Sequence, residues 1–137
     1  MEDRVLQHTP DFIFHLGDYA DDAQELRNIF PRIPFASVKG NCDFYSDEPT
    51  DLLLTLEDVK LFLTHGHRYG VKMDLLRLKY SAIEQGARVA LFGHTHCPFF
   101  SDQDGVILFN PGSVRDGAHY GLIEISKGIV QCHLLQG

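Results

Sequence analysis

Short apolar runs separated by polar turn residues follow one another along most of this chain. That alternation is typical of a layered α/β domain. Strands are expected at residues 11–16, 35–39, 51–56, 59–64, 88–92, 106–109, 120–125 and 129–134. Turns are expected at Glu57-Asp58, Asp104-Gly105 and Lys127-Gly128, where polar or glycine residues separate two runs. We find no internal repeat, low-complexity tract or linker.

Two helices are expected between these strands. In the first, Asp22 would cap a short helix whose apolar residues Ala23, Leu26 and Phe30 share one face, and Pro31 would end it. The second is expected over residues 72–85 and is amphipathic, with Gly86 just past its end. Its apolar positions recur at spacings of three and four residues: Met73, Leu76, Tyr80 and Ile83.

The size and composition indicate one domain, residues 1–137. A chain of 137 residues with 44% hydrophobic composition can bury one core and is too short for two ordinary domains. Its three cysteines are widely spaced, which favours a reducing, cytoplasmic setting over a disulfide framework. No apolar run approaches the roughly 20 residues of a membrane-spanning helix, so no membrane association is expected.

Charge is distributed unevenly between the two halves of the chain. Residues 1–58 carry 13 acidic and 4 basic side chains, and residues 59–137 carry 6 and 8. Nucleic-acid binding is therefore unlikely to be the function, because no basic stripe is available for a phosphate backbone. A small phosphorylated substrate stays compatible with the acidic half, since a bound cation would reverse the local field.

Four polar motifs come directly after predicted strands. In a layered α/β protein the functional loops gather there. Each motif alone is weak evidence, because a glycine followed by Asp or Asn is also an ordinary turn or helix cap, and a single His-x-His pair is often an exposed loop. The motifs are Gly17-Asp18-Tyr19-Ala20-Asp21, Gly40-Asn41-Cys42-Asp43, Thr64-His65-Gly66-His67 and Gly93-His94-Thr95-His96.

Together the four motifs indicate a metal site. They supply two His-x-His pairs, an Asp and an Asn that converge if their strands lie in neighbouring positions. Carboxylate and amide oxygens combined with neutral imidazoles suit divalent manganese, iron or zinc, and no thiolate cluster competes for a softer metal. The chain has no G-x-S-x-G motif or other sign of a side-chain nucleophile.

The order G-D-x-x-D, G-N-x-D, H-G-H and G-H-x-H, followed by Asn110-Pro111-Gly112-Ser113, resembles the calcineurin-like metallophosphoesterases. The match is to their small bacterial phosphodiesterase branch and runs from about residue 11 to the C-terminus. The resemblance implies a layered α/β/β/α sandwich. It also implies a centre of two divalent ions, with Mn2+ the expected metal, that hydrolyses a small phosphoester through a metal-activated hydroxide.

The resemblance assigns a role to each motif residue. Asp18 would bridge both ions, and Asn41, His65 and His94 would complete the second ion's ligands. His96 would bind the first ion, while His67, the expected catalytic residue, would lie just outside as a hydrogen-bond partner. Asp21 and Asp43 would be turn or supporting carboxylates. Four further histidines match no motif and are expected to be structural or at the surface: His8, His15, His119 and His133.

Two departures from the family pattern qualify these roles. Relatives open with a strand followed by D-x-H, which supplies two ligands of the first ion, and no D-x-H precedes Asp18 here. The expectation is therefore an N-terminally truncated domain that lacks the first strand and retains one ion, with the exposed strand edges favouring a homo-oligomer. Cys42 stands where many relatives have a catalytic His, and we expect it to be an inert thiol.

Two functions from different classes stay open. A metal-dependent phosphodiesterase is favoured because the second ion's expected ligands are all present. The alternative is a non-catalytic protein-binding scaffold of the same fold, like the metal-poor retromer subunit that the resemblance includes. The Asn110-Pro111-Gly112-Ser113 turn is equally compatible with a plain structural turn and with a substrate contact.

Overall fold

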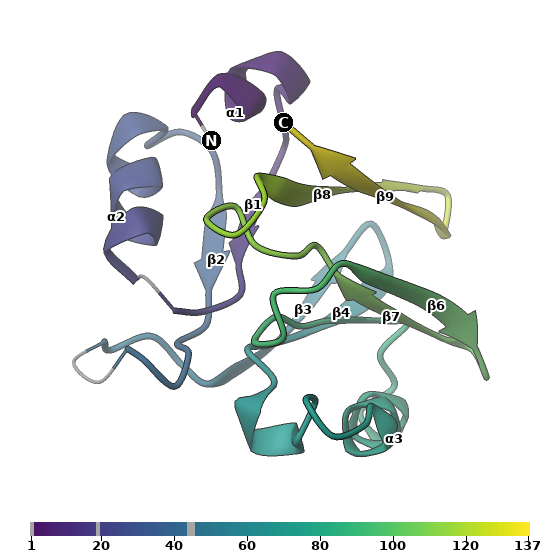
Figure 1. Ribbon diagram of the computed structural model, residues 1–137. Coiled ribbons are helices and arrows are strands. Elements are labelled where there is room, and N and C mark those ends of the chain that lie inside the picture. Colours follow the sequence, from purple (N-terminus) through teal and green to yellow (C-terminus); the bar gives the residue numbers. More distant parts are fainter. Residues whose placement is uncertain (1, 19, 44–45) are drawn as a thin grey trace.

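Four layers stack in the order helix, sheet, sheet, helix in the computed structural model of the chain (Figure 1). The structure describes residues 2–18, 20–43 and 46–137. The outer helical layer holds α1 (Glu2–His8) and α2 (Ala20–Ile29), and the opposite outer layer holds α3 (Leu76–Glu84), which follows a short 3-10 helix at His67–Tyr69. This is the layered α/β/β/α architecture that the sequence predicts.

A five-stranded mixed sheet forms the central support of the molecule. Its strands are ordered β3-β4-β5-β7-β6, with β4, β5 and β7 mutually parallel in the middle and an antiparallel strand at each edge. The three middle strands are buried on both faces, as parallel strands covered on both sides must be. The strands are β3 (Asp51–Leu56), β4 (Val59–Thr64), β5 (Val89–Leu91), β6 (Phe99–Gln103) and β7 (Val106–Asn110).

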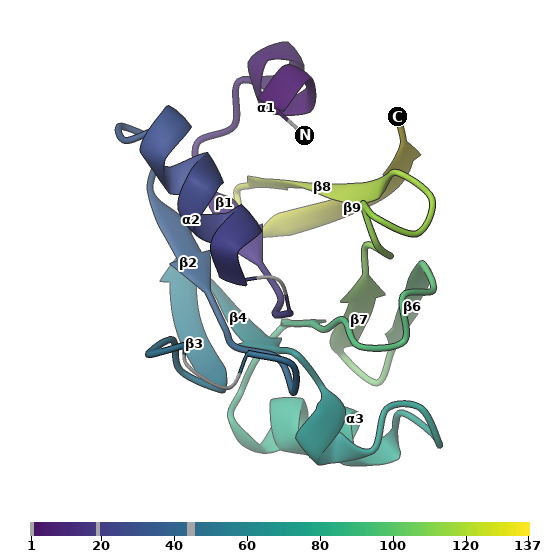
Figure 2. The same ribbon diagram turned by 60° about the vertical axis from the view of Figure 1, so that its left-hand side comes forward.

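The second sheet layer consists of two separate strand pairs (Figure 2). β1 (Ile13–His15) pairs in parallel with β2 (Phe35–Ser37), and β8 (His119–Ser126) pairs with β9 (Ile129–Gln136) as an antiparallel hairpin. Among the described residues, no ladder joins one pair to the other. The expectation that the domain lacks its first strand stays a prediction.

Two apolar clusters, one on each face of the five-stranded sheet, form the core. Leu61, Leu63 and Val89 point towards the split sheet layer and meet Phe14 and side chains of β8 and β9. The other face of the same strands meets α3 through Leu78 and Ala82, both fully buried. Alternate residues of one strand thus serve two cores, which fixes the register of the central strands.

The observed elements correct several predicted ones. α2 begins at Ala20, so Asp22 lies inside the helix and does not cap it. α3 begins at Leu76, later than predicted, and it buries the face that carries Leu78 and Ala82. The predicted apolar stripe of that helix faces solvent instead, with Met73 89% exposed. Strand β6 was not predicted from the sequence, because its residues show no alternating pattern.

The hairpin of β3 and β4 has the predicted boundaries, and the remaining predicted strands occur with ends shifted by a few residues. In the part of the chain that the structure describes, no helix is long and apolar enough to cross a membrane.

Candidate metal centre

The predicted motifs meet at one edge of the two sheet layers. Asp18 follows β1, Asn41 follows β2, His65 follows β4 and His94 follows β5. β4 and β5 run parallel, as do β1 and β2, so each pair delivers its carboxyl-end loops to the same side. The site therefore spans both sheets, with two donors from each.

One imidazole nitrogen lies at the centre of this group. His65 Nε2 is 3.1 Å from His94 Nδ1, 3.2 Å from Asn41 Oδ1 and 3.4 Å from Asp18 Oδ2. Two donors bound to one ion at about 2.0–2.1 Å stand about 3.4 Å apart in a tetrahedral arrangement. The contacts around His65 are thus close to the spacing of ligands that share an ion.

A hydrogen bond at the other ring nitrogen fixes the orientation of His65. The residue is 1% exposed, and its Nδ1–H donates to the backbone carbonyl oxygen of Leu16 over 2.8 Å. This bond leaves the lone pair of Nε2 directed at Asp18, Asn41 and His94. A backbone carbonyl on the far nitrogen is the usual partner of a metal-binding histidine, because it sets the tautomer and holds the ring.

Glycines allow the loops to approach this closely. A Cβ atom on Gly40 would stand 2.0 Å from Asp18 Oδ1 and 2.5 Å from the Asp18 backbone nitrogen. A Cβ on Gly17 would stand 2.7 Å from His65 Nδ1, and the φ of Gly17 is +102°. Neither position can hold a larger residue without moving a donor. The glycines of the first two motifs therefore have a direct packing reason.

Asp18 occupies a buried and strained position. It is 7% exposed with a φ of +56°, a conformation that costs a non-glycine residue about 1–2 kcal/mol. The backbone N–H of Cys42 donates to Asp18 Oδ1 over 3.0 Å. One carboxylate oxygen is thus held by the β2 loop while the other faces His65, and the strain is retained at the point where the two loops meet.

His94 is neutral at physiological pH. Burial, followed by the neighbouring His65, lowers its pKa to about 4. Its backbone has a φ of +67°, which turns the ring towards His65 with centroids 4.9 Å apart. A neutral imidazole keeps the lone pair that a metal ion requires.

His67 lies beside the cluster, and none of the contacts above is made by it. Its ring centroid is 5.2 Å from that of His65 and 6.1 Å from that of His94. Its Nδ1 is buried and has no hydrogen-bond partner among the described residues, and burial lowers its pKa. A buried nitrogen without a partner is costly, so this atom marks a place where a further bound group would complete a hydrogen bond.

His96 is not brought to the His65 cluster by any contact in the described residues. Its side chain is 39% exposed, and its Nδ1 contacts Asp116 in the loop before β8. That loop is attached to α2 by Arg115, which donates to both carboxylate oxygens of Asp22. Sequence reasoning missed Asp116 and Arg115, because neither belongs to a motif and their partners lie far away in the chain.

Asn110 fixes the loop that carries His94 and His96. It is fully buried, and its Nδ2 donates to the backbone oxygen of Gly93 over 3.2 Å and to Thr95 Oγ1 over 3.0 Å. Its Oδ1 accepts from the N–H of Gly112 over 2.9 Å. This bonding gives the Asn-Pro-Gly-Ser turn a structural role next to the site.

The remaining polar motif residues have ordinary roles. Asp43 Oδ2 accepts from the N–H of Gly40 over 2.8 Å, which is a turn contact as predicted. The side chain of Asp21 lies outside the described residues. The neighbouring charge of Asp18, with burial second, raises the pKa of Cys42, so this exposed thiol is less ionised than a free cysteine and a poor nucleophile.

Three of the four unassigned histidines are away from the cluster. His8 contacts the Tyr120 hydroxyl at 3.1 Å and His133 pairs with Glu124 at 2.8 Å, whereas His119 is held through its backbone N–H, which donates to Ser113 O. His15 differs, because it lies at the end of β1 near Asp43, Asp22 and Asp18, and burial lowers its pKa. The sequence offered no signal for this placement.

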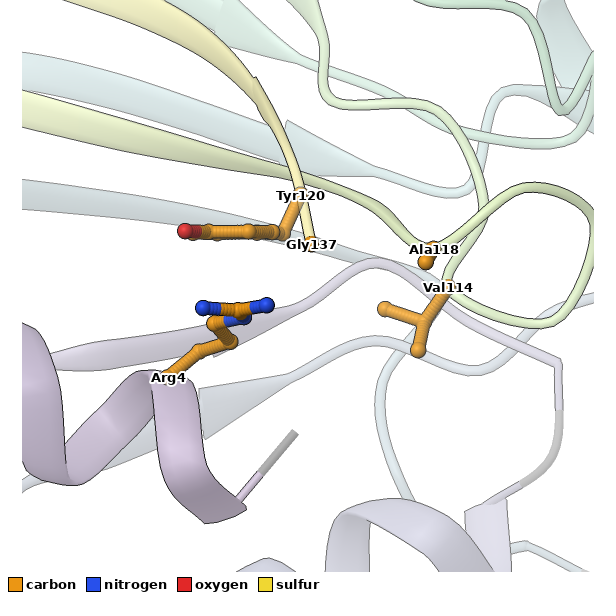
Figure 3. Close-up of a pocket in the computed structure, with 5 residues that line it drawn as sticks. All are labelled: Arg4, Val114, Ala118, Tyr120 and Gly137. Carbon is orange, nitrogen blue, oxygen red and sulfur yellow. The ribbon is translucent and has the colours of Figure 1, made fainter.

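A separate small cavity of about 60 Å³ lies between α1 and the start of β8. Figure 3 shows Arg4 of α1 extending towards the ring of Tyr120, with Val114, Ala118 and Gly137 around them. None of the motif residues lines this cavity. It is therefore not part of the candidate centre.

The donor set fits a divalent transition metal, though it is not a preformed cage. Among residues 2–18, 20–43 and 46–137, no three His, Cys, Asp or Glu side chains are grouped closely enough to hold an ion by themselves. The fourth donor here is the Asn41 amide, and the three short contacts all share His65 Nε2. Two imidazoles with two oxygens suit manganese, iron or zinc.

The family follows from a comparison with known proteins. A family model described as "Calcineurin-like phosphoesterase superfamily domain" matches residues 2–128. The chain belongs to this superfamily. The probable metallophosphoesterase YsnB of Bacillus subtilis is 43% identical over 106 residues, and phosphodiesterase YfcE of Escherichia coli K12 is 34% identical over 116 residues. These matches cover 77% and 74% of this chain.

This calcineurin-like phosphoesterase domain spans only 60% of YsnB and 58% of YfcE. A crystal structure of a predicted phosphoesterase from Streptococcus pneumoniae TIGR4 superposes with a TM-score of 0.81 at 27% identity, covering 98% of this chain and 80% of the other. Vps29 of Entamoeba histolytica complexed with zinc superposes with a TM-score of 0.75 at 21% identity, covering 98% and 86%. This second likeness establishes the fold alone.

Proposed function

We propose that this domain is a metal-dependent phosphodiesterase that hydrolyses a small phosphoester. The observation that carries the proposal is the convergence of Asp18, Asn41 and His94 on a single nitrogen of His65. These four residues come from four different loops in two sheet layers. Their shared focus is what a metal site needs.

Each residue then has a distinct task. Asp18, Asn41, His65 and His94 would hold one ion, with Mn2+ as the proposed metal. Asn41 is exposed, so the group opens to solvent on that side and a substrate can approach. A bound divalent ion would lower the pKa of water and stabilise charge on the phosphoryl oxygens.

The neighbouring histidines would act on the substrate side of the site. The unpartnered Nδ1 of His67 would form a hydrogen bond with another group bound to the ion, which makes His67 the proposed catalytic residue. His96, turned by its contact with Asp116, would serve a second and weaker ion. We expect close to one tightly bound ion per chain, measurable by elemental analysis after desalting.

We also propose a reducing compartment such as the cytoplasm. Cys42, Cys97 and Cys132 are all free, and Cys42 and Cys97 are exposed. Exposed free thiols are more readily retained where glutathione and thioredoxin keep them reduced.

Hydrolysis of bis-p-nitrophenyl phosphate with added Mn2+ tests the function. The metal-loaded chain should release p-nitrophenol slowly, and His94→Ala should abolish the metal-dependent release. His133→Ala is the matched control, because His133 is exposed on β9 and its side chain pairs with Glu124, away from the cluster.

Appending an N-terminal strand that carries Asp-x-His should raise the rate by about a hundred- to a thousand-fold, the usual effect of one transition-state contact. An extended, metal-loaded protein that stays inert towards phosphodiesters and monoesters, while binding a protein partner tightly, would support the scaffold function instead.

A further inference from the structure

Helix α3 presents an apolar stripe to solvent. Met73, just before the helix, is 89% exposed, and along the helix Leu76 is 54%, Tyr80 64% and Ile83 44% exposed. At 100° per residue the three helical side chains, Leu76, Tyr80 and Ile83, fall within about 60° of one another around the helix axis. The opposite face is the one that packs on the sheet, through Leu78 and Ala82. An exposed stripe of four large apolar side chains on one face is typical of an interaction surface.

The charges beside the stripe show which kind of surface it fits. Arg77 and Glu84 lie on the same flank, at about 100° and 80° from Leu76, and are about 10.5 Å apart along the helix. Both are exposed, and neither makes an ion pair in the part of the chain that the structure describes. On the other flank, Lys79 is already paired with Asp104.

A second copy of the same helix satisfies these charges in one arrangement. When two identical helices pack antiparallel about a two-fold axis, residues on one flank meet residues on the same flank of the other copy. An axis at the level of residues 80 and 81 places Arg77 opposite Glu84 of the other copy, twice. A parallel arrangement would instead bring this flank against the Lys79 flank, where the cation already has a partner.

The apolar side chains fit the same axis. Ile83 of the second copy then lies at a level between Leu76 and Tyr80 of the first, so that the stripes interdigitate. The two Tyr80 rings meet near the axis, where aromatic pairs gain about 0.5–1.5 kcal/mol beyond their buried area. The alternation of large side chains and the charge pair thus specify one register.

We propose that α3 is a homodimer interface in which two copies pack antiparallel through Met73, Leu76, Tyr80 and Ile83, with reciprocal Arg77–Glu84 ion pairs. One helix per copy buries less than the about 1,200 Å² of total area that stable complexes reach. The dimer is therefore in concentration-dependent exchange with the monomer.

Sedimentation equilibrium of the chain between about 5 and 500 µM tests the proposal. We expect a monomer–dimer equilibrium in which Tyr80→Glu and Ile83→Glu each raise the dissociation constant by at least about ten-fold. Ile129→Glu is the matched control, because Ile129 is 65% exposed at the start of β9, and it should change nothing. All these positions are exposed, so circular dichroism should be unchanged.

A charge-reversal cycle decides between this register and any other. Arg77→Glu and Glu84→Arg should each weaken the dimer, since each places like charges together twice, and the double variant should restore it. A monomer at all concentrations, or a dimer that Ile83→Glu leaves intact, would overturn the proposal. Weakening by both single variants without rescue in the double would overturn the antiparallel arrangement.

Discussion

The two halves of the candidate centre differ in how firmly their histidines are held. His65 is buried, held from behind by Leu16 and in contact with donors from three other loops. The side chain of His96 is 39% exposed, and its one ion-pair contact in the described residues is with Asp116. The difference follows from the position of each histidine relative to its strand. His65 comes directly after β4, a strand that is buried on both faces. A donor directly after a rigid strand is held in place, whereas His96 lies five residues past the end of β5 and contacts a carboxylate of another loop.

The largest effect should come from removing His65, with the removal of His96 as the comparison. His65→Ala deletes the nitrogen that the other donors share, so the affinity for Mn2+ should fall by at least about 100-fold, more than the loss of a supporting contact. His96→Ala should change the affinity of the tight ion by less than about ten-fold. Titration of metal-free protein against a fluorescent chelator measures both, with circular dichroism as the check on folding. Equal losses would show that the two histidines serve one ion.

The loop contact behind Asp18 can be broken without touching a donor. Gly40→Ala places a methyl group 2.0 Å from Asp18 Oδ1, so the two loops must separate. We expect a destabilisation of about 1–3 kcal/mol, as for other overpacked sites, together with a clear loss of metal affinity. Denaturant unfolding and the chelator titration measure the two effects. Gly105→Ala is the control, because no atom lies within 4 Å of its added Cβ and only backbone strain is expected.

The His96 side of the comparison can be sharpened through Asp116. Asp116→Asn removes the carboxylate that contacts His96. The affinity of the weaker ion should fall by about ten-fold, which is the lower end of the loss expected when a ligand's supporting contact is removed. The tight ion should be unaffected. Asp104→Asn is the matched control, because Asp104 pairs with Lys79 far from the centre. The visible absorption spectrum of the Co2+-loaded protein reports on His96 directly. A change in the tight ion's spectrum would contradict the separation of the two halves.

The smallest expected effect is on stability in mild acid. Burial lowers the pKa of His15, His67 and His94 in the native state, to about 4 for His94. The unfolded chain therefore binds more protons between about pH 4 and 6.5, and the free energy of unfolding falls as the pH drops through that range. Above about pH 6.5 the contribution is complete. The Tm of metal-free protein should be lower at about pH 5 than at about pH 7.5, and His94→Gln should reduce the difference. A pH-independent Tm would contradict it.

Much of this architecture could be predicted from local patterns. The β3–β4 hairpin occurs with the predicted ends, because its alternating apolar residues and the Glu57-Asp58 turn are encoded within a few neighbouring positions. The four motifs together predicted which side chains would converge, although each motif alone is also typical of an ordinary turn or helix cap. The strand β6 was missed, because Phe99 and Phe100 lie at an exposed edge without a polar alternation.

The tertiary structure decided which faces are buried and which donors meet. The stripe with the strongest helical periodicity, around Tyr80, faces solvent, because α3 has apolar residues on two faces and only the neighbouring sheet selects between them. Asp116 reached His96, and His65 became the shared neighbour, through contacts between loops distant in the chain. Local sequence sets the conformational preferences of a segment, but the free energy of burial is gained only against a partner surface that the rest of the chain supplies.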